Sequence, residues 1–351
     1  MYILGINFSH HGSICLLKDG EVVLFLEEER LSHNKYSSIN DYSYKVLHKI
    51  KDYTDKIDYV CLSADCAYLN EVESTFNYNE NKLKNIFNIL VTRSNIYHST
   101  TYIQKCSVIW EIISTFCTNK TKVYLEMVSH HKVHAAQSFY NSGFKEALCI
   151  VIDGQGSRKN DDYSNKLLFE RESIYYFNYE NNGNQLYCNY DSEGNGIGSA
   201  YSRVTRDIGF TGGFEEGKTM GLSSYKPHNM EDPTMMVNVA KANAVQLGTQ
   251  EEALKLILYS LTLSDSKNIC ISGGYGLNCV SNYYIRRNLP PDINLYCEPV
   301  ANDAGQSIGI AKFIHHYLTG DKTIRPQKSI YYGPTPEYWN DTLAKTPLKP
   351  N

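Results

Sequence analysis

The sequence predicts an α/β protein of two similar lobes with a cleft between them. The same order of elements, a strand, a polar loop containing glycine and a β-hairpin, begins at residues 2–8 and again at residues 146–152. This self-similarity indicates an internal duplication, and a chain of 351 residues is long enough to bury a core in each half. We therefore predict a first lobe over residues 1–145, with a polar insertion near 70–102, and a second lobe over 146–325.

Composition and charge exclude several classes of function. The net charge is -4, and lysine and arginine are scattered, which argues against a nucleic-acid surface. No apolar run approaches the roughly 20 residues that a membrane helix needs, and the first residues lack a basic leader. We therefore expect a cytoplasmic protein that binds neither membrane nor nucleic acid. The cysteines sit mostly within apolar runs, which predicts buried thiols in a reducing compartment.

The first lobe opens with a strand over residues 2–8 and a polar loop, Ser9-His10-His11-Gly12-Ser13. Strands over 13–18 and 21–27 follow, joined by a two-residue turn at Asp19-Gly20. A glycine in such a loop lets backbone amides approach an anion, so we interpret the loop as a candidate phosphate contact.

The rest of the first lobe is less informative. The charged run 27–35, taken alone, is typical of a solvated surface. Helical spacing over 42–53 precedes a strand over 57–63, and the polar stretch 70–102 reads as helix and loop. An apolar helix is predicted over 108–116.

A pair of histidines begins the next helix. Residues 122–128 are typical of a strand, and Ser129 then caps a helix that carries His130 and His134. Side chains at this spacing stand about 6 Å apart on one face. Two such imidazoles can bind one metal, although this spacing also occurs by chance in solvated or buried helices.

The second lobe begins with a strand that ends in a carboxylate. Residues 146–152 form a continuous apolar run, which favours a buried strand, and Asp153-Gly154 follows at once. Open α/β sheets place ligands at this end of their strands. Asp153 would complete a three-point metal site.

Two glycine-rich stretches follow a hairpin with strands at 173–179 and 185–190. They cover residues 193–198 and 211–222, and the second contains Lys218. A flexible surface loop would explain them. We favour the interpretation that Lys218 presents its charge to an anion.

The end of the second lobe repeats the strand, glycine and helix order. Long helices over 230–263 precede a strand over 268–271 and the segment 272–278, whose double glycine is typical of an anion contact at a helix start. A strand over 295–300 then leads to Asp303 at the start of a helix. Asp303 is either a helix cap or a fourth metal ligand.

These segments together resemble a known family. The chain is similar to the amino-terminal domain of the O-carbamoyltransferases of antibiotic and nodulation-factor biosynthesis, which are relatives of the tRNA threonylcarbamoyl transferases. The resemblance implies a duplicated actin and sugar-kinase-like (ASKHA) fold with a central interlobe cleft. The matching segments, in order, are Ile3 to Ser13, Asp19-Gly20, Glu28-Glu29-Arg30 with Lys35, His130-His131 with His134-Ala135, Asp153-Gly154, Glu216-Gly217-Lys218 with Met220-Gly221-Leu222, Gly273-Gly274 with Asn278, and Asp303-Ala304-Gly305.

The resemblance also implies roles for particular residues. It makes His10 a candidate general base and Lys35 a phosphate contact. It implies a metal site for Fe(2+) or another divalent ion, formed by His130, His134, Asp153 and Asp303. It assigns ATP binding to Gly154, Glu216, Lys218, Gly273, Gly274 and Asn278.

The implied activity is ATP- and metal-dependent carbamoyl transfer. Carbamoyl phosphate would be converted to a carbamoyl adenylate, and a hydroxyl of a small-molecule or sugar acceptor would attack it. Two departures stand out. The family usually has aspartate where this chain has His11, and it continues into a YrdC-like domain, to which residues 326–351 are the expected start or linker.

Two alternatives remain open at this stage. A kinase or ATPase of the same fold would need carboxylates at magnesium and no paired histidines, so the histidine pair disfavours it. A nucleotide- and metal-binding subunit without activity of its own would need a separate YrdC-like partner.

Overall fold

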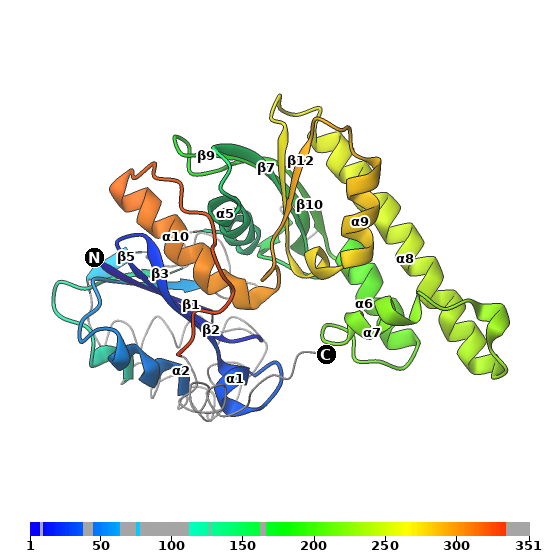
Figure 1. Ribbon diagram of the computed structural model, residues 1–351, viewed down its shortest axis with the longest axis horizontal. Helices are drawn as coiled ribbons and strands as arrows, with labels where there is room; N and C mark the ends of the chain where they lie inside the picture. The colour runs from blue at the N-terminus through cyan, green and yellow to red at the C-terminus, as the bar shows by residue number, and fades with distance from the viewer. Residues whose placement is uncertain are drawn as a thin grey trace, which may run out of the picture.

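The computed structural model describes residues 1–7, 10–37, 45–63, 75–77, 112–125, 128–161 and 166–334. These residues form two lobes, each built around one mixed β-sheet (Figure 1). Most of the predicted insertion at 70–102, the start of the helix predicted at 108–116 and most of the segment 326–351 lie outside the described residues.

The first sheet has the order β3-β2-β1-β4-β6-β5. β1 pairs antiparallel with β2 and parallel with β4, so the first strand of the chain is central. β2 pairs antiparallel with β3, and β4 pairs parallel with β6. The strands are β1 (Tyr2–Asn7), β2 (Ser13–Lys18), β3 (Glu21–Glu27), β4 (Tyr59–Ser63), β5 (Thr75–Asn77) and β6 (Lys122–Leu125).

The short strand β5 corrects the prediction of helix and loop for this part of the chain. β5 pairs antiparallel with β6 at the edge of the sheet. A strand of this length leaves too little pattern to detect, and an edge strand tolerates polar residues because only one of its sides is paired.

The second sheet repeats this topology in the order β10-β9-β7-β11-β12, with β8 paired to β9. β7 pairs antiparallel with β9 and parallel with β11, so it takes the place that β1 has in the first sheet. The predicted duplicated, two-lobed fold is therefore confirmed. The strands are β7 (Glu146–Ile152), β8 (Arg158–Asn160), β9 (Leu167–Asn178), β10 (Asn184–Asp191), β11 (Asn268–Ser272) and β12 (Asn294–Cys297).

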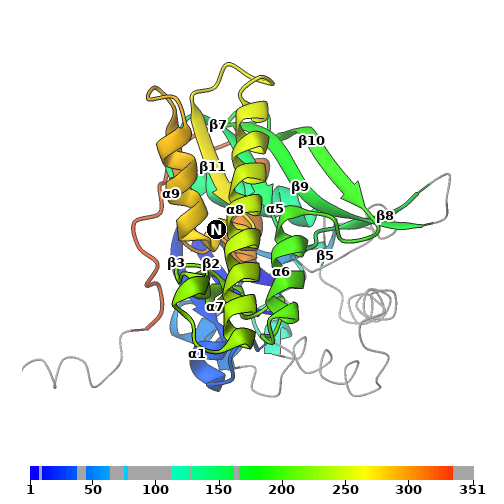
Figure 2. The ribbon, with the colours of Figure 1, turned by 90° about the vertical axis from the view of Figure 1, so that its right-hand side faces the viewer.

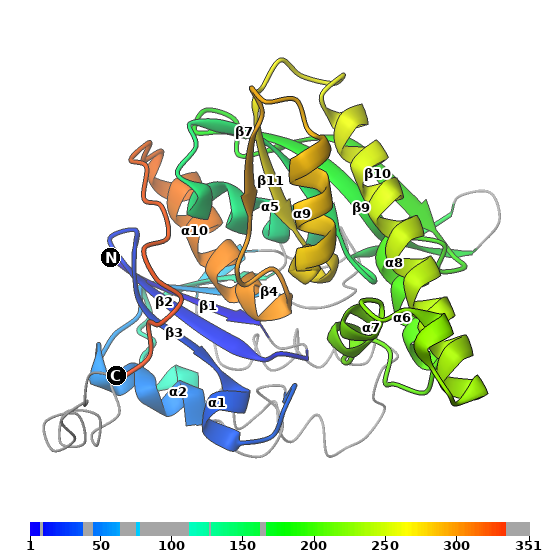
Figure 3. The ribbon, with the colours of Figure 1, turned by 45° about the vertical axis from the view of Figure 1, so that its right-hand side comes forward.

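Helices cover both faces of the second sheet (Figures 2 and 3). Alternate residues of β7 divide between two cores: Cys149 packs with α5, whereas Ile150 packs with α8 and α9. No helix among the described residues is both long and apolar enough to cross a membrane. The helices are α1 (Glu28–Ser32), α2 (Lys45–His48), α5 (His130–Ser142), α6 (Ile197–Asp207), α7 (Glu216–Leu222), α8 (Pro233–Ser260), α9 (Cys279–Asn288) and α10 (Gln306–Thr319), with 3-10 turns η1 (Lys49–Asp52), η2 (Pro227–Asn229), η3 (Gly274–Leu277) and η4 (Asp303–Gly305).

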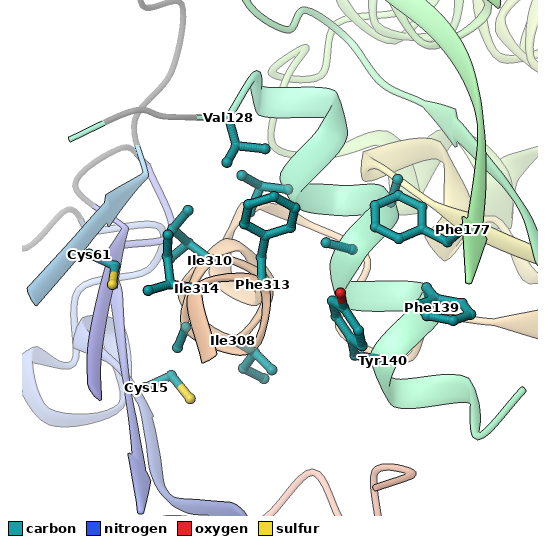
Figure 4. Packing of buried hydrophobic residues seen from close by; sticks show 14 of the residues in the cluster. Cys15, Cys61, Val128, Phe139, Tyr140, Phe177, Ile308, Ile310, Phe313 and Ile314 are labelled. Atoms are coloured by element: carbon teal, nitrogen blue, oxygen red, sulfur yellow. The ribbon is translucent and has the colours of Figure 1, made fainter. Parts of the chain in front are cut away.

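Helices α5 and α10 pack against each other between the two sheets (Figure 4). α5 follows a strand of the first sheet but packs on β7 and β11, and α10 follows the second sheet but packs on β1, β2 and β4. Figure 4 shows Ile310 and Ile314 of α10 facing Cys61 of the first sheet. The Gln306 side-chain amide donates to the His130 carbonyl oxygen at 3.1 Å, so the two helices begin side by side.

Glycine is required where these two helices touch. A Cβ on Gly309 of α10 would lie 2.5 Å from the carbonyl oxygen of Val133 in α5, whereas a Cβ on Gly248 of α8 would meet nothing within 4 Å. We expect Gly309→Ala to destabilise the protein by about 1–3 kcal/mol through overpacking. Gly248→Ala should stabilise it by about 0.5–1 kcal/mol, because alanine favours the helix. Urea denaturation of both variants tests this, and equal shifts would contradict it.

The described end of the chain ties the second lobe back to the first. Residues 320–334 leave α10, and the Gln327 amide donates to the Asn141 carbonyl at the end of α5 at 2.9 Å. The Phe25 amide of β3 donates to the Tyr332 carbonyl at 3.3 Å. This segment therefore covers the edge of the first sheet.

A buried lysine lies under this segment. Lys312 of α10 is 4% exposed, and its ammonium donates to Asn141 Oδ1 at 2.8 Å and to the Arg325 carbonyl at 3.2 Å. Burial lowers the pKa of Lys312 from 10.5 to about 8. The folded protein therefore releases this proton at a lower pH than the unfolded chain does.

The free energy of unfolding should consequently change with pH in the alkaline range, because Lys312 titrates there in the folded protein. Between about pH 8 and 10.5 the unfolded chain binds a proton that the folded protein does not, so the free energy of unfolding rises with pH. Across this pH range we expect the free energy of unfolding of the wild type to rise by on the order of 3 kcal/mol relative to that of Lys312→Met. Urea denaturation of both proteins from pH 7.5 upward measures the difference, and a constant difference would refute the prediction.

Candidate metal and ligand site

Four predicted metal ligands come together between the lobes. His130 and His134 project from α5, Asp153 follows β7, and Asp303 lies in η4 at the start of α10. One ligand atom from each residue lies within 4.8 Å of the others. The paired beginnings of α5 and α10, together with the end of β7, therefore place the four side chains around one point.

The nitrogen and oxygen atoms of this cluster are close enough to share one cation. His130 Nε2 lies 3.3 Å from Asp153 Oδ2 and 3.5 Å from Asp303 Oδ1. His134 Nε2 lies 3.3 Å from Asp303 Oδ1. Among the described residues neither ring nitrogen of His134 makes a hydrogen bond of good geometry. A buried imidazole nitrogen is therefore able to coordinate a metal ion.

The cluster concentrates charge in a buried place. All four side chains are buried. Burial raises the pKa of Asp153 and Asp303, but the neighbouring histidines outweigh it and hold both carboxyl pKa values below their usual range. Burial lowers the pKa of His130, but the two carboxylates outweigh it and raise that pKa well above its usual value. Two buried carboxylates thus favour a positive charge beside them, which either a protonated His130 or a divalent cation can supply.

The helix start that carries the histidines is fixed by local hydrogen bonds. Ser129 Oγ accepts from the Lys132 amide at 3.2 Å, which confirms the predicted cap. The His130 amide donates to Ser157 Oγ at 2.9 Å. His131 turns away from the cluster, with Nδ1 at 2.8 Å from Ser173 Oγ. Only His130 and His134 of this helix therefore point into the site.

The first-lobe loop brings a third histidine to the cluster. His10 follows β1 as Asp153 follows β7, and its Nε2 lies 3.5 Å from Asp303 Oδ2. Its side chain is 40% exposed and lines the adjoining cavity. The neighbouring His11 has φ 60°, and burial lowers its pKa to about 4.

A cavity of about 890 Å³ opens onto the cluster. Its wall includes Asp153 and Asp303, so the buried cluster forms one end of the cavity. Tyr36 from the first lobe and Phe214 from the second meet in its wall, where the Tyr36 hydroxyl donates to the Phe214 carbonyl. Of the residues predicted to bind nucleotide, four line it: Gly154, Glu216, Gly274 and Asn278.

The double glycine is shaped by the end of β7. Gly273 has φ +85°, and a Cβ there would lie 2.4 Å from the Ile152 carbonyl oxygen, so only glycine fits. The Gly274 amide donates to Asp153 Oδ1 at 2.9 Å. The structure differs from the expected anion contact at a helix start, because this amide binds Asp153 and η3 separates it from α9. Asn278 caps α9 by accepting from the Ser281 amide at 3.0 Å.

The two predicted lysines do not line the cavity. Lys35 is exposed and lies over the Tyr36 ring, 4.7 Å from its centre. Lys218 is exposed and forms an ion pair with Glu215, three residues earlier. The phosphate contacts assigned to both lysines stay predictions.

Sequence reasoning missed the cations that do line the cavity. These are Arg171 of β9 and Arg203 and Arg206 of α6. Arg171 is buried, and its Nη1 donates to the Gly154 carbonyl at 2.7 Å, beside a metal-ligand candidate. The spacing of Ser199, Arg203 and Arg206 on one face of a helix was the available signal.

Comparison with protein families gives one match that covers most of the chain. The family described as carbamoyltransferase N-terminus matches residues 2–244 and 242–312. These ranges contain every residue proposed above for the metal cluster and for the cavity.

Curated relatives match along nearly the whole chain. An uncharacterized protein of Synechocystis sp. is 26% identical over 402 residues, which cover 95% of this chain and 60% of that protein. Nodulation protein NolNO of Sinorhizobium fredii is 24% identical over 369 residues, which cover 93% of this chain and 49% of NolNO. The chain thus spans about half to three fifths of the length of these relatives.

Solved structures show the same fold at low identity. HypF of T. kodakarensis matches with a TM-score of 0.53 at 11% identity, covering 91% of this chain and 48% of that one. A full-length HypF in a phosphate- and nucleotide-bound form matches with a TM-score of 0.50 at 12% identity, covering 92% of this chain and 56% of that one. At these identities the likeness concerns the fold alone.

Proposed function

This chain belongs to the family described as carbamoyltransferase N-terminus, and we propose that it catalyses ATP- and metal-dependent transfer of a carbamoyl group to an acceptor hydroxyl. The donor in this proposal is carbamoyl phosphate, which loses its phosphate with uptake of water and joins the AMP part of ATP as a carbamoyl adenylate while pyrophosphate leaves; transfer to the hydroxyl then releases AMP. The observation that carries the proposal is the buried cluster of two histidines and two carboxylates at one end of an interlobe cavity.

The donor set of the cluster fits a divalent metal. His130, His134, Asp153 and Asp303 would hold it, and imidazole with carboxylate suits Fe(2+) among other ions. When bound, such an ion stabilises negative charge that develops on a phosphoryl or carbamoyl oxygen. The position of His134 Nε2, 3.3 Å from Asp303 Oδ1 in the buried cluster, supports this fit.

The protein's own groups supply the remaining parts of the reaction. His10 stands beside Asp303 and lines the cavity, so it is placed to accept the proton of an acceptor hydroxyl. Gly274 and Asn278 form part of the wall where we place ATP. The lobes join at Tyr36 and Phe214, which both line the cavity.

The length of the relatives bears on how the activity is organised. Because this chain spans 60% and 49% of two relatives, we propose that a YrdC-like domain, on the same polypeptide or on another, forms the adenylate. A second candidate function follows from the same observation. The described lobes would then bind metal and nucleotide without independent turnover.

Release of AMP and pyrophosphate tests the activity. The assay contains the protein, Fe(2+), ATP, carbamoyl phosphate and a hydroxyl acceptor, with and without a YrdC-like domain. Turnover that needs both carbamoyl phosphate and ATP would support transfer. Binding of metal and ATP without turnover in either condition would favour the non-catalytic subunit, and binding of neither would refute both proposals.

Nucleotide binding should depend on the glycine beside Asp153. A Cβ on Gly274 would lie 3.2 Å from Asp153 Oδ1, and a valine would narrow the cavity wall there. We expect Gly274→Val to weaken binding of a nonhydrolysable ATP analogue at least about tenfold, which corresponds to about 1.4 kcal/mol of binding free energy, because the side chain would block close approach of the nucleotide to the backbone. Calorimetry measures the affinity, and Gly248→Val in open space on α8 is the matched control. Equal affinity in both variants would place ATP elsewhere.

A further inference from the structure

A row of buried polar side chains lies across three neighbouring strands of the first sheet. In the strand register Asn7 of β1 stands opposite Ser13 of β2 and opposite Ser63 of β4. All three side chains are buried, and a buried polar group is costly unless it is hydrogen-bonded. Their hydrogen-bond partners therefore show what the row does.

The two serines of the row bind the beginning of α10. Ser13 Oγ donates to the Ala304 carbonyl at 2.6 Å. Ser63 Oγ donates to Gln306 Oε1 at 2.7 Å. Both acceptors lie within three residues of the metal-ligand candidate in η4, so the row fixes this turn against the first sheet.

Asn7 differs from the serines because its amide also binds the loop after β1. Its Nδ2 donates to the Asp303 carbonyl at 2.9 Å, to the His11 carbonyl at 3.3 Å and to the His10 carbonyl at 3.4 Å. An amide nitrogen carries two hydrogens, so one can serve the turn while the two loop carbonyls share the other. Asn7 thus ties the loop to a turn that lies 296 residues further along the chain.

The geometry favours an amide at this position. Three carbonyl oxygens face the Asn7 nitrogen, and an ionised aspartate could not donate to any of them. A serine hydroxyl has one hydrogen, so it cannot donate to the loop and to the turn at once. Replacement of Asn7 should therefore release the loop from the turn.

The two segments that Asn7 joins carry groups that must meet in the proposed reaction. His10 is the proposed general base, and its Nε2 lies 3.5 Å from Oδ2 of the metal-ligand candidate Asp303. Both residues line the cavity. Since the Asn7 amide binds the backbone of both, it sets how far the base stands from the ligand. A misplacement of about 1 Å can cost roughly 10²-fold in rate.

We propose that Asn7 is a positioning residue that holds His10 against Asp303. Asn7 lies outside the lining of the cavity and acts through the backbone carbonyls of these two residues. Its effect on the rate rests on the proposed function, because His10 is the base of that reaction. Its effect on the position of His10 can be measured without turnover.

A double-mutant cycle with His10→Asn tests whether Asn7 acts through His10. We expect Asn7→Ala to lower carbamoyl transfer roughly 10²-fold when His10 is present. In a protein that already carries His10→Asn the further loss should be less than about threefold, because residues that act through one another are not additive. Asn7→Ser, which has a single donor hydrogen, should behave in the same way and serves where Asn7→Ala does not fold.

Ser63→Ala is the matched control for this cycle. It removes another buried donor of the same row, whose partner is Gln306 and not the loop. Any change in rate that it causes should be the same with and without His10→Asn. Such additivity would separate a general support of the α10 start from the positioning of His10.

Crystal structures at equal metal content measure the position of His10 directly. In Asn7→Ala, or Asn7→Ser, we expect His10 Nε2 to lie at least about 1 Å farther from Asp303 Oδ2 than in wild type. In Ser63→Ala the two atoms should keep their wild-type separation.

Three results would overturn the proposal. The first is a loss of rate in the Asn7 variants that is equally large with and without His10→Asn. The second is an unchanged separation of His10 and Asp303 in these variants, and the third is an equal displacement in Ser63→Ala. A wild type without turnover, with and without a YrdC-like domain, would refute the proposed function instead. The crystal structures would then still show whether Asn7 positions His10.

Discussion

His134→Ala is expected to remove the bound metal and to lower carbamoyl transfer by roughly 10³-fold. His134 is fully buried, and its Nε2 lies 3.3 Å from Asp303 Oδ1. A side chain on the surface therefore cannot take its place as a metal ligand. Alanine would leave three ligands, which are one histidine and two buried carboxylates. Elemental analysis of anaerobically prepared protein gives the metal content, and AMP release gives the rate.

Two other histidines serve as controls for this variant. His33→Ala changes an exposed side chain and should leave metal content and rate unchanged. His131→Gln changes a buried histidine of the same helix whose Nδ1 faces Ser173 and which is not one of the four converging ligands, so it should keep the metal even if stability falls. A His134→Ala protein with full metal content would show that the cluster is not the metal site.

Much of the fold could be predicted because it depends on local patterns. The continuous apolar run of β7 specifies a strand within a few residues. The pattern around Asp19-Gly20 specifies a turn between two strands in the same way. Ser129 identified the start of α5, and the structure shows its cap. The duplication was predicted because the order of a strand, a glycine-containing loop and a β-hairpin occurs twice in the sequence.

The meeting of the four metal-ligand candidates was also predicted, but only in part from local signals. The spacing of His130 and His134 and the position of Asp153 after a buried strand were visible in the sequence. Asp303 was ambiguous, because an aspartate before a helix usually caps it. Packing of α10 beside α5 brings the Asp303 carboxylate to the histidines, which favours the prediction that Asp303 is a fourth ligand.

What the sequence did not reveal depends on tertiary contacts. The sequence did not show that Glu215 pairs with Lys218, at a spacing that a helix turn allows, and the anion contact of Lys218 stays a prediction. Arg203 and Arg206 were not among the predicted site residues, because their spacing on one helix face does not show by itself that α6 borders a cavity. Exposure of a side chain to a site is decided by neighbours distant in sequence.

His10→Asn is expected to lower carbamoyl transfer by about 10²–10⁴-fold, the range for loss of a general base. His10 Nε2 lies 3.5 Å from Asp303 Oδ2, and the side chain reaches both the cluster and the cavity. It is not among the four converging ligands, so metal content should stay at the wild-type value. The decisive readouts are rate, metal content and affinity for the ATP analogue, measured on the same preparation.

His11→Asn separates the role of His10 from that of the loop. His11 also lines the cavity, but burial lowers its pKa to about 4, which makes it a weak base near neutral pH. Its φ of 60° is one that asparagine tolerates, so the variant should fold and lose less than about tenfold in rate. The acid limb of the pH–rate profile should persist in His11→Asn and disappear in His10→Asn. Equal losses in the two variants, with unchanged profiles, would show that the loop positions the substrate and that neither histidine takes the proton.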